Sequence, residues 1–308
     1  MARRRKGRPV NGWVLLDKPA GMTSTRAVAA VKRLFDAAKA GHGGTLDPLA
    51  TGLLPVALGE ATKTVPYVME GRKVYRFTVR WGEARTTDDA EGAVTATSDK
   101  RPTGPEIEAM LARFQGEIDQ VPPVFSAIKV EGERAYDLAR AGEPVELEPR
   151  RVLIERLTLV GQPDADHAEF EAVTGKGAYM RSLARDLALA LGTVGHVSAL
   201  RRIAVGPFTI SQAISLESLE ALGHSPAASG HLLPVEAALD DIPALPLTDA
   251  EALRLRSGQS VGLLRASDRE RLGAIHNGDL VCAMAGGKPV ALARLESGDL
   301  RPVRVLHL

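Results

Sequence analysis

Val74-Tyr-Arg-Phe-Thr-Val-Arg-Trp81 alternates apolar and polar residues, which predicts a half-buried β-strand. Gly92-Ala-Val-Thr-Ala-Thr97 predicts a strand that returns beside it. Residues 151–160 and 168–173 alternate in the same way, and 178–191 has the apolar spacing of a helix. Because strands and helices mix without a strict β-α-β rhythm, we expect an α+β fold with a largely antiparallel, mixed sheet flanked by helices.

The chain divides by composition into several segments. Residues 1–9 form a basic extension, and residues 10–244 form the main domain. Within it, the proline-punctuated stretch 119–150 carries one short predicted helix and is expected to be inserted off the sheet. From about residue 245 short apolar runs alternate with glycine pairs, which predicts a small β domain over 245–308.

Composition excludes several classes of protein. Of 308 residues, 44% are hydrophobic and 25% are charged, as in a globular chain rather than a disordered one. No apolar run approaches the length of a membrane span, and the N-terminus lacks a secretory signal, so we expect a cytoplasmic protein without membrane contact. Cys282 is the single cysteine and cannot form an internal disulfide. No Cys/His cluster has zinc spacing, so no structural metal is expected.

Charge is distributed unevenly although the formal net charge is only +1. The first 35 residues hold nine Lys or Arg against Asp17 alone, whereas residues 203–253 hold seven acidic residues and no Lys or Arg. This asymmetry would let one face attract a polyanion such as RNA while another repels it. For the run from Arg3 to Arg8, a nucleic-acid contact and a solubilising tail both remain open.

The segment Gly41-His-Gly-Gly-Thr-Leu-Asp-Pro-Leu-Ala-Thr-Gly52 has neither a helical nor a strand period and is predicted to be a loop. Its glycines allow the backbone to approach a ligand closely, and Pro48 restricts Asp47 to an extended conformation. An ordinary turn would explain the same residues. No nucleotide-binding glycine motif occurs in the chain, so no nucleotide cofactor is expected.

Several residues could assemble around Asp47. A carboxylate is ionised at neutral pH and can act as a nucleophile, and Arg181 could pair with it, although a solvated helix arginine is the alternative. Tyr75 and Tyr179 could stack on a base that has been flipped out of an RNA, or could be plain core residues. His42 could be a proton shuttle, a wedge against a nucleic acid, or a loop histidine without a role.

Six motifs, in this order along the chain, resemble those of the bacterial tRNA pseudouridine-55 synthases, the TruB family. They are Leu16-Asp-Lys-Pro-Ala-Gly-Met-Thr-Ser24, Gly41 to Leu54, Val121-Pro-Pro-Val-Phe-Ser-Ala-Ile-Lys129, Gly132-Glu-Arg-Ala-Tyr136, Gly177-Ala-Tyr-Met-Arg-Ser-Leu183 and Leu200-Arg-Arg-Ile-Ala-Val-Gly-Pro-Phe208. The resemblance covers about residues 10–215. From about 245 the chain is similar to the family's small C-terminal RNA-binding (PUA-like) domain only in its strand and glycine pattern.

The resemblance implies the pseudouridine synthase fold and isomerisation of uridine 55 in the T-loop of tRNA, with no cofactor, metal or energy source. Asp47 would be the nucleophile, attacking either C1′ of the ribose or C6 of the uracil. Tyr75 would stack on the flipped base and take part in removing the C5 proton, and Arg181 would pair with Asp47.

The same resemblance assigns the rest of the substrate site. Tyr179 and Leu200 would line the pocket and retain the freed uracil, and His42 would lie near the flipped nucleotide. Lys18, with Pro19, would brace the loop behind the active site.

The resemblance also concerns partners. The insertion 119–150 would be a thumb that closes on the T-arm of tRNA, and Leu49 to Leu54 are similar to the stand-alone enzymes, so neither a guide RNA nor an obligate protein partner is expected. Two other classes compete. A tRNA-folding chaperone would not need Asp47, and a hydrolase of a small glycoside would need a second carboxylate, for which Asp88 and Asp89 are candidates.

Overall fold

The computed structural model describes residues 7–126, 128–130, 132–263 and 266–308. Residues 1–6, which carry most of the basic extension, lie outside this part of the chain. Within the described ranges no helix is both long and apolar enough to cross a membrane.

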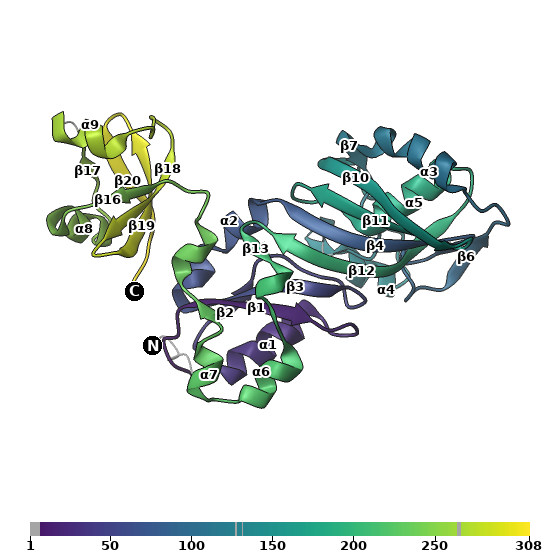
Figure 1. Ribbon diagram of the computed structural model, residues 1–308, viewed down its shortest axis with the longest axis horizontal. Coiled ribbons are helices and arrows are strands. Elements are labelled where there is room, and N and C mark those ends of the chain that lie inside the picture. The colour runs from purple at the N-terminus through teal and green to yellow at the C-terminus, as the bar shows by residue number, and fades with distance from the viewer. Residues whose placement is uncertain (1–6, 127, 131, 264–265) are drawn as a thin grey trace.

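A large mixed sheet forms the centre of the molecule (Figure 1). Its strands are β1 (Gly12–Lys18), β2 (Ala40–His42), β3 (Thr51–Leu58), β4 (Lys73–Trp81), β7 (Gly116–Gln120), β10 (Arg150–Asp164), β11 (His167–Thr174), β12 (Gly195–Val205), β13 (Phe208–Thr209), β14 (Ile214–Ser215) and β15 (Leu232–Leu233). Their main order is β14-β1-β3-β12-β4-β11-β10-β7. Along it β14 with β1 and β3 with β12 are parallel, and the other neighbours are antiparallel. The expected α+β fold with a largely antiparallel sheet is confirmed.

One face of the sheet is buried under helices α1 (Ser24–Leu34), α3 (Gly104–Leu111) and α5 (Met180–Ala190). Helix α1 begins at Ser24, where the Thr23 hydroxyl caps it by accepting a hydrogen bond from the Arg26 amide. These elements share one apolar core, which includes Leu16, Val31, Leu54, Phe77, Ile107, Phe170, Leu183 and Leu187. This core holds the ends of β2, β3 and α5 in place, and those ends carry the candidate site.

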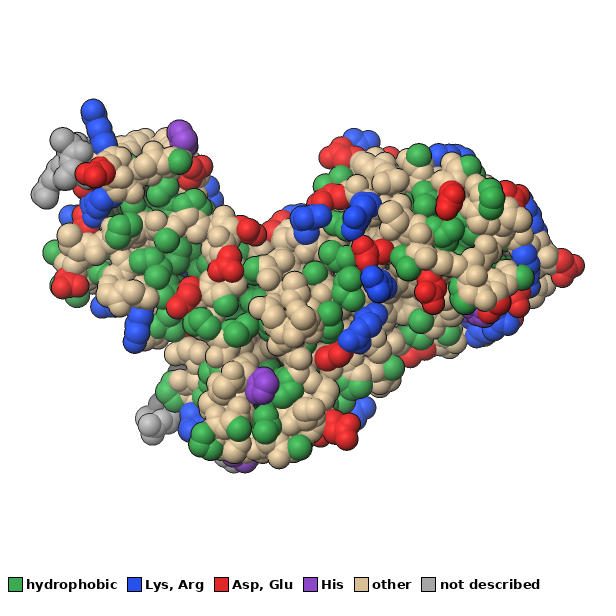
Figure 2. Space-filling view, in the orientation of Figure 1, with side chains coloured by type: hydrophobic (Ala, Val, Ile, Leu, Met, Phe, Trp, Pro, Cys, Tyr) green, Lys and Arg blue, Asp and Glu red, His purple; other side chains and the backbone are tan. Residues whose placement is uncertain are grey.

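The opposite face of the sheet is apolar at one end and charged at the other. Trp13, Leu15 and Leu53 pack there against Phe208 and Val235 in a second core. Further along, the face carries ion pairs between neighbouring strands and turns, namely Arg72–Glu155, Arg76–Glu171, Arg156–Glu171 and Arg201–Asp17. Figure 2 shows that basic and acidic side chains are intermixed on the surface it displays rather than separated into fields of one sign.

Two excursions leave the sheet. Between β7 and β10 the chain forms β8 (Lys129–Val130), β9 (Glu133–Arg134) and α4 (Ala135–Arg140), within the expected thumb. Strand β6 (Val94–Thr97) pairs with β5 (Glu83–Arg85) in a separate two-stranded sheet. The prediction that it returns beside Val74–Trp81 is therefore wrong, because β11 and β12 occupy both edges of that strand.

A small β domain follows the main domain along the chain. It contains β16 (Ala244–Pro246), β17 (Val261–Gly262), β18 (Leu280–Ala285), β19 (Lys288–Glu296), β20 (Asp299–Val305), α8 (Asp249–Arg256) and α9 (Ala266–Leu272) around an apolar core of its own. Cys282 is 3% exposed, and burial raises the pKa of its thiol to about 11. After β20 the chain returns to the main domain, where Leu306 joins the second core and the His307 amide donates to Glu60 (2.8 Å).

The connections between these layers are short helices. They are η1 (Gly59–Lys63), α2 (Val65–Glu70), η2 (Ala112–Phe114), η3 (Ile210–Gln212), α6 (Leu216–Leu222), α7 (Pro226–Ser229) and η4 (Val235–Ala238). The acidic residues of the stretch 203–253 lie on α6, η4 and α8 and in the turn that follows η4.

Candidate active site

Asp47 lies in the loop 43–50, which joins β2 to β3 at one end of the sheet. Its side chain is 32% exposed, so the carboxylate is open to solvent. The prediction of one continuous loop from Gly41 to Gly52 is wrong at both ends, because Gly41 and His42 pair with β3 and Gly52 pairs with β1. Strand β2 has only three residues, which is too short to show an alternation of apolar and polar residues. Strand β3 begins at Thr51-Gly52, where the glycine hides the alternation.

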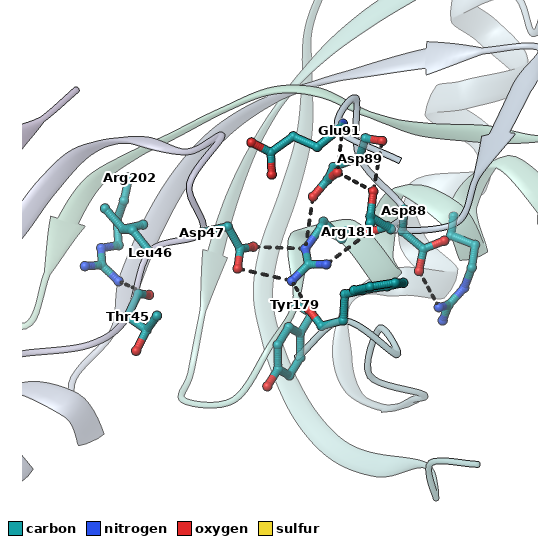
Figure 3. Close-up of polar contacts among 12 residues, drawn as sticks. Thr45, Leu46, Asp47, Asp88, Asp89, Glu91, Tyr179, Arg181 and Arg202 are labelled. Atoms are coloured by element: carbon teal, nitrogen blue, oxygen red, sulfur yellow. Dashed lines mark hydrogen bonds and ion pairs between the residues drawn. The ribbon is translucent and has the colours of Figure 1, made fainter. Parts of the chain in front are cut away.

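Asp47 forms a bidentate ion pair with Arg181 (Figure 3). Arg181 Nε lies 2.9 Å from Asp47 Oδ2, and Nη2 lies 3.1 Å from Oδ1. This arrangement fixes the orientation of the carboxylate relative to the guanidinium group, and both hydrogen bonds join oppositely charged groups.

Arg181 is itself held by two further segments. Its side chain is 4% exposed, Nη1 donates to the Thr87 carbonyl (2.9 Å), and Nη2 donates to the Phe125 carbonyl (3.0 Å). The alternative of a solvated helix arginine is therefore excluded. Helix α5 begins at Met180, two residues later than predicted, because Tyr179 is an extended N-cap, and Arg181 lies in the first turn.

The two candidate second carboxylates have different surroundings. Asp89 is 3% exposed, and its Oδ2 lies 3.7 Å from Arg181 Nε. Its Oδ1 accepts hydrogen bonds from the Thr87 hydroxyl and the Glu91 amide. Asp88 instead pairs with Arg185 (2.9 Å). Asp89 thus belongs to the polar cluster around Arg181, whereas Asp88 faces the next turn of α5.

His42 lies at the end of β2, just before the loop that carries Asp47. Its Nδ1 accepts a hydrogen bond from the Gly44 amide (3.3 Å). Burial, and secondarily the positive charge of Arg202, lower the pKa of His42 below its usual range. The ring is therefore neutral at pH 7, with the proton on Nε2 because Nδ1 is the acceptor.

Lys18 lies beneath the loop and is fully buried. Its ammonium group donates to the carbonyls of Pro19 (2.8 Å), Met22 (2.7 Å) and Pro48 (3.3 Å). Burial lowers the pKa of Lys18 to about 8, and the nearby Asp47 charge opposes that shift. The structure thus places Lys18 behind the loop, bonded to the carbonyl of the residue that follows Asp47.

Three further candidates lie at the edge of the same region. Tyr75 and Leu200 lie on the adjacent strands β4 and β12, whose register pairs Tyr75 with Arg202 and Leu200 with Phe77, and Leu200 is 8% exposed. Tyr179 is fixed by two hydrogen bonds of its backbone to the Gln120 side chain (2.8 and 3.1 Å). Burial, and next the Asp47 charge, raise the pKa of its phenol.

Sequence reasoning missed Arg202. Its side chain is 1% exposed and donates to the carbonyls of Leu53 (2.9 Å), Gly44 (2.9 Å) and Thr45 (3.4 Å), so it ties the loop to β12. The signal was available, because Arg202 is two residues from Leu200 and therefore lies on the same, buried face of the strand. In the described part of the chain, no cluster of three or more His, Cys, Asp or Glu side chains could hold a metal ion.

Comparison with known families gives two matches. Residues 32–180 match the N-terminal domain model of the TruB family of pseudouridylate synthases, and residues 181–240 match the tRNA pseudouridylate synthase B C-terminal domain model.

Comparison with individual proteins agrees with these matches. The chain is 60% identical to tRNA pseudouridine synthase B of Rhodospirillum rubrum over 308 residues, covering 100% of both chains. Among solved structures, a chain of a Cbf5-Nop10-Gar1 complex has a TM-score of 0.70 and 27% identity over 93% of this chain and 79% of that one. A chain of an H/ACA RNP bound to a substrate RNA has a TM-score of 0.73 and shares the fold at 24% identity, over 100% of this chain and 92% of that one.

Proposed function

This chain belongs to the TruB family of pseudouridylate synthases and is an isomerase of tRNA, and from that premise we propose that it converts uridine 55 in the T-loop to pseudouridine with Asp47 as the nucleophile. One observation carries the proposal. The carboxylate of Asp47 is partly exposed on a loop, while a buried arginine holds both of its oxygens.

The reaction is an internal rearrangement of one nucleotide. The bond between N1 of uracil and C1′ of ribose breaks, the base turns, and C5 bonds to C1′. C5 loses a proton and N1 gains one, so atoms and electrons balance without a co-reactant. Asp47 would add to C1′ or to C6 and leave again at the end. Arg181 would hold the carboxylate in one orientation, because its own position is set by Thr87 and Phe125.

The remaining site residues would bind and retain the flipped base. Extruding a uridine from a folded loop costs a few kcal/mol, which stacking on an aromatic ring can offset. Tyr75 would provide that stacking and assist removal of the C5 proton, while Tyr179 and Leu200 would keep the uracil from leaving. Neutral His42 would contact the flipped nucleotide, and Lys18 would position the loop from behind.

Binding of the rest of the tRNA would use segments outside this site. The thumb would close on the T-arm, and the small β domain and residues 1–9 would add contacts to the RNA. RNA is recognised largely by shape and by splayed bases, which suits such a grip on a folded loop. We expect the enzyme to act in the cytoplasm without a guide RNA.

The surroundings of Asp89 and Asp88 argue against the competing hypothesis, a hydrolase of a small glycoside. A glycosidase needs a second carboxyl group that can donate a proton to the leaving group. Asp89 is 3% exposed and already accepts two hydrogen bonds, and Asp88 is paired with Arg185.

The proposal is tested by mapping pseudouridine in an unmodified tRNA transcript after incubation with the intact chain. We expect modification at position 55, none in a transcript with cytidine at that position, and none with Asp47→Asn. Asp240→Asn, in the exposed turn between η4 and β16, serves as the matched control and should act like the wild type. Tight tRNA binding with no modification by the wild type would instead support the chaperone.

A further inference from the structure

The segment between β5 and β6 contains a residue in an unusual conformation. Asp88 has φ +57°, the left-handed region that residues other than glycine adopt rarely. It lies between Thr87, whose carbonyl accepts from Arg181, and Asp89, whose carboxylate faces Arg181. Any relaxation at Asp88 would therefore move two of the groups that surround Arg181.

Arg185 holds Asp88 in place. It lies four residues after Arg181 on α5, hence on the same side of the helix. Its Nη1 donates to Asp88 Oδ2 (2.9 Å), its Nη2 to the Val121 carbonyl (2.9 Å), and its Nε to Asp186 (2.9 Å). The side chains of Arg185 and Asp88 are 25% and 17% exposed, so water screens this pair only in part.

Arg181 and Arg185 make parallel connections. Each donates to one residue of the segment between β5 and β6, and each donates to one backbone carbonyl at the base of the thumb, Phe125 for Arg181 and Val121 for Arg185. Ser182 adds a third bond, from its hydroxyl to the Val121 carbonyl (2.8 Å). Helix α5 thus connects the base of the thumb to the segment between β5 and β6, and Arg181 contacts both.

We propose that Arg185 is a positioning residue, which fixes Asp88 and the thumb base so that Arg181 stays aligned with Asp47. It touches neither the substrate nor the reacting atoms in this account, and it acts through Arg181. The role rests on the proposed isomerase activity.

The physical reason is the environment of Asp88. Burial raises the pKa of this carboxyl above its usual range, and Arg185 opposes that shift, so the carboxylate depends on its partner. Without Arg185 the charge would seek water and the strained backbone would relax with it. The carbonyl of Thr87 would then shift relative to Arg181, and a misplacement of about 1 Å in an active site can reduce a rate about 100-fold.

The test measures chemistry and binding separately in the full-length protein. With a tRNA transcript carrying tritium at C5 of uridine, single-turnover release at saturating enzyme gives the rate, and filter binding gives the dissociation constant. We expect Arg185→Met and Asp88→Asn each to lower the rate about tenfold or more, with the dissociation constant within about threefold of wild type. The double variant should lose no more than Arg185→Met alone, because both break one connection.

Arg101→Met is the matched control. Arg101 is also partly buried, pairs with Asp166 and donates to two backbone carbonyls, but it lies in the loop that precedes α3. We expect its rate to match the wild type. A wild-type rate in either Arg185→Met or Asp88→Asn, or additive losses in the double variant, would overturn the proposal. If Arg185→Met does not fold, Asp88→Asn and Arg185→Lys decide, with the lysine variant expected between wild type and Asp88→Asn. An inactive wild type would contradict the proposed function instead.

Discussion

Two arginine–aspartate pairs of similar geometry lie on opposite faces of the same sheet. Arg181 holds Asp47 through contacts of 2.9 and 3.1 Å, and Arg201 holds Asp17 through contacts of 3.0 and 2.7 Å. The surroundings differ, because the side chain of Arg181 is 4% exposed and that of Arg201 is 41% exposed.

The difference lies in what the arginine does with its other donors. Arg181 also binds carbonyls of two separate segments, whereas Arg201 adds one long contact to the Thr51 hydroxyl (3.4 Å). A bidentate pair is therefore not in itself the mark of a reactive site. Burial of the cation together with exposure of the anion is what aims a carboxylate outward.

Replacing Arg181 should have the largest effect on the isomerisation rate. In Arg181→Met the carboxylate of Asp47 loses both hydrogen bonds and its orientation, so we expect the isomerisation rate to fall about 100-fold or more. Arg181→Lys should retain part of the rate, because an ammonium group keeps the charge but not the planar fork. Single-turnover tritium release measures both, and a wild-type rate in Arg181→Met would contradict the assigned role.

A third arginine–carboxylate pair differs from these two in a way that the pH dependence of stability can measure. In the small β domain Arg271 donates two bonds of 2.9 Å to Glu251 and lowers the pKa of that carboxyl to about 2. Because the folded pKa lies below the unfolded value, the stabilisation is complete above about pH 4.5 and is lost as the pH falls towards 2.

Glu251→Gln should accordingly lower the free energy of unfolding by about 1 kcal/mol at pH 7, since water screens much of the interaction. The difference from wild type should shrink as the pH falls from 5 to 3. Calorimetric melting at several pH values measures it, and a gap independent of pH would show that the ion pair does not stabilise the domain.

Replacing Arg201 should have the smallest effect. An exposed ion pair contributes about 1 kcal/mol or less, so Arg201→Met should lower the free energy of unfolding by no more than that and leave the isomerisation rate within about twofold of wild type. Urea unfolding and tritium release measure the two quantities. A tenfold loss of rate would show that the face opposite Asp47 also contributes to catalysis.

Local signals predicted much of the fold. The alternation of Val74 to Trp81 located β4, and the apolar spacing of residues 178–191 located α5 to within two residues. The pairing of Val94–Thr97 with β5 was not predictable in this way, because alternation shows that a segment is a strand but not which neighbour it joins.

The candidate site shows the same difference between local features, which the sequence marks, and contacts between distant residues, which it does not. Glycine spacing around Asp47 marked the loop. For Arg181 the residues left both a pair with Asp47 and a solvated helix arginine open, and the structure shows the pair. The strand position of Arg202 was readable, and Asp89 was a candidate carboxylate, but their hydrogen-bond and ion-pair partners could not be assigned from sequence, because those contacts cross the sheet and the chain. Such contacts leave no period in the sequence around either residue.

The central claim is that Asp47 is the reactive carboxylate, and Asp17 provides its internal control. Both residues form bidentate pairs with an arginine, and Asp→Asn at either position changes the side chain by the same atoms. The most direct measurement is single-turnover tritium release from uridine-labelled tRNA by the wild type, Asp47→Asn and Asp17→Asn. We expect release by the wild type and by Asp17→Asn and none by Asp47→Asn, whereas release by Asp47→Asn would contradict the account.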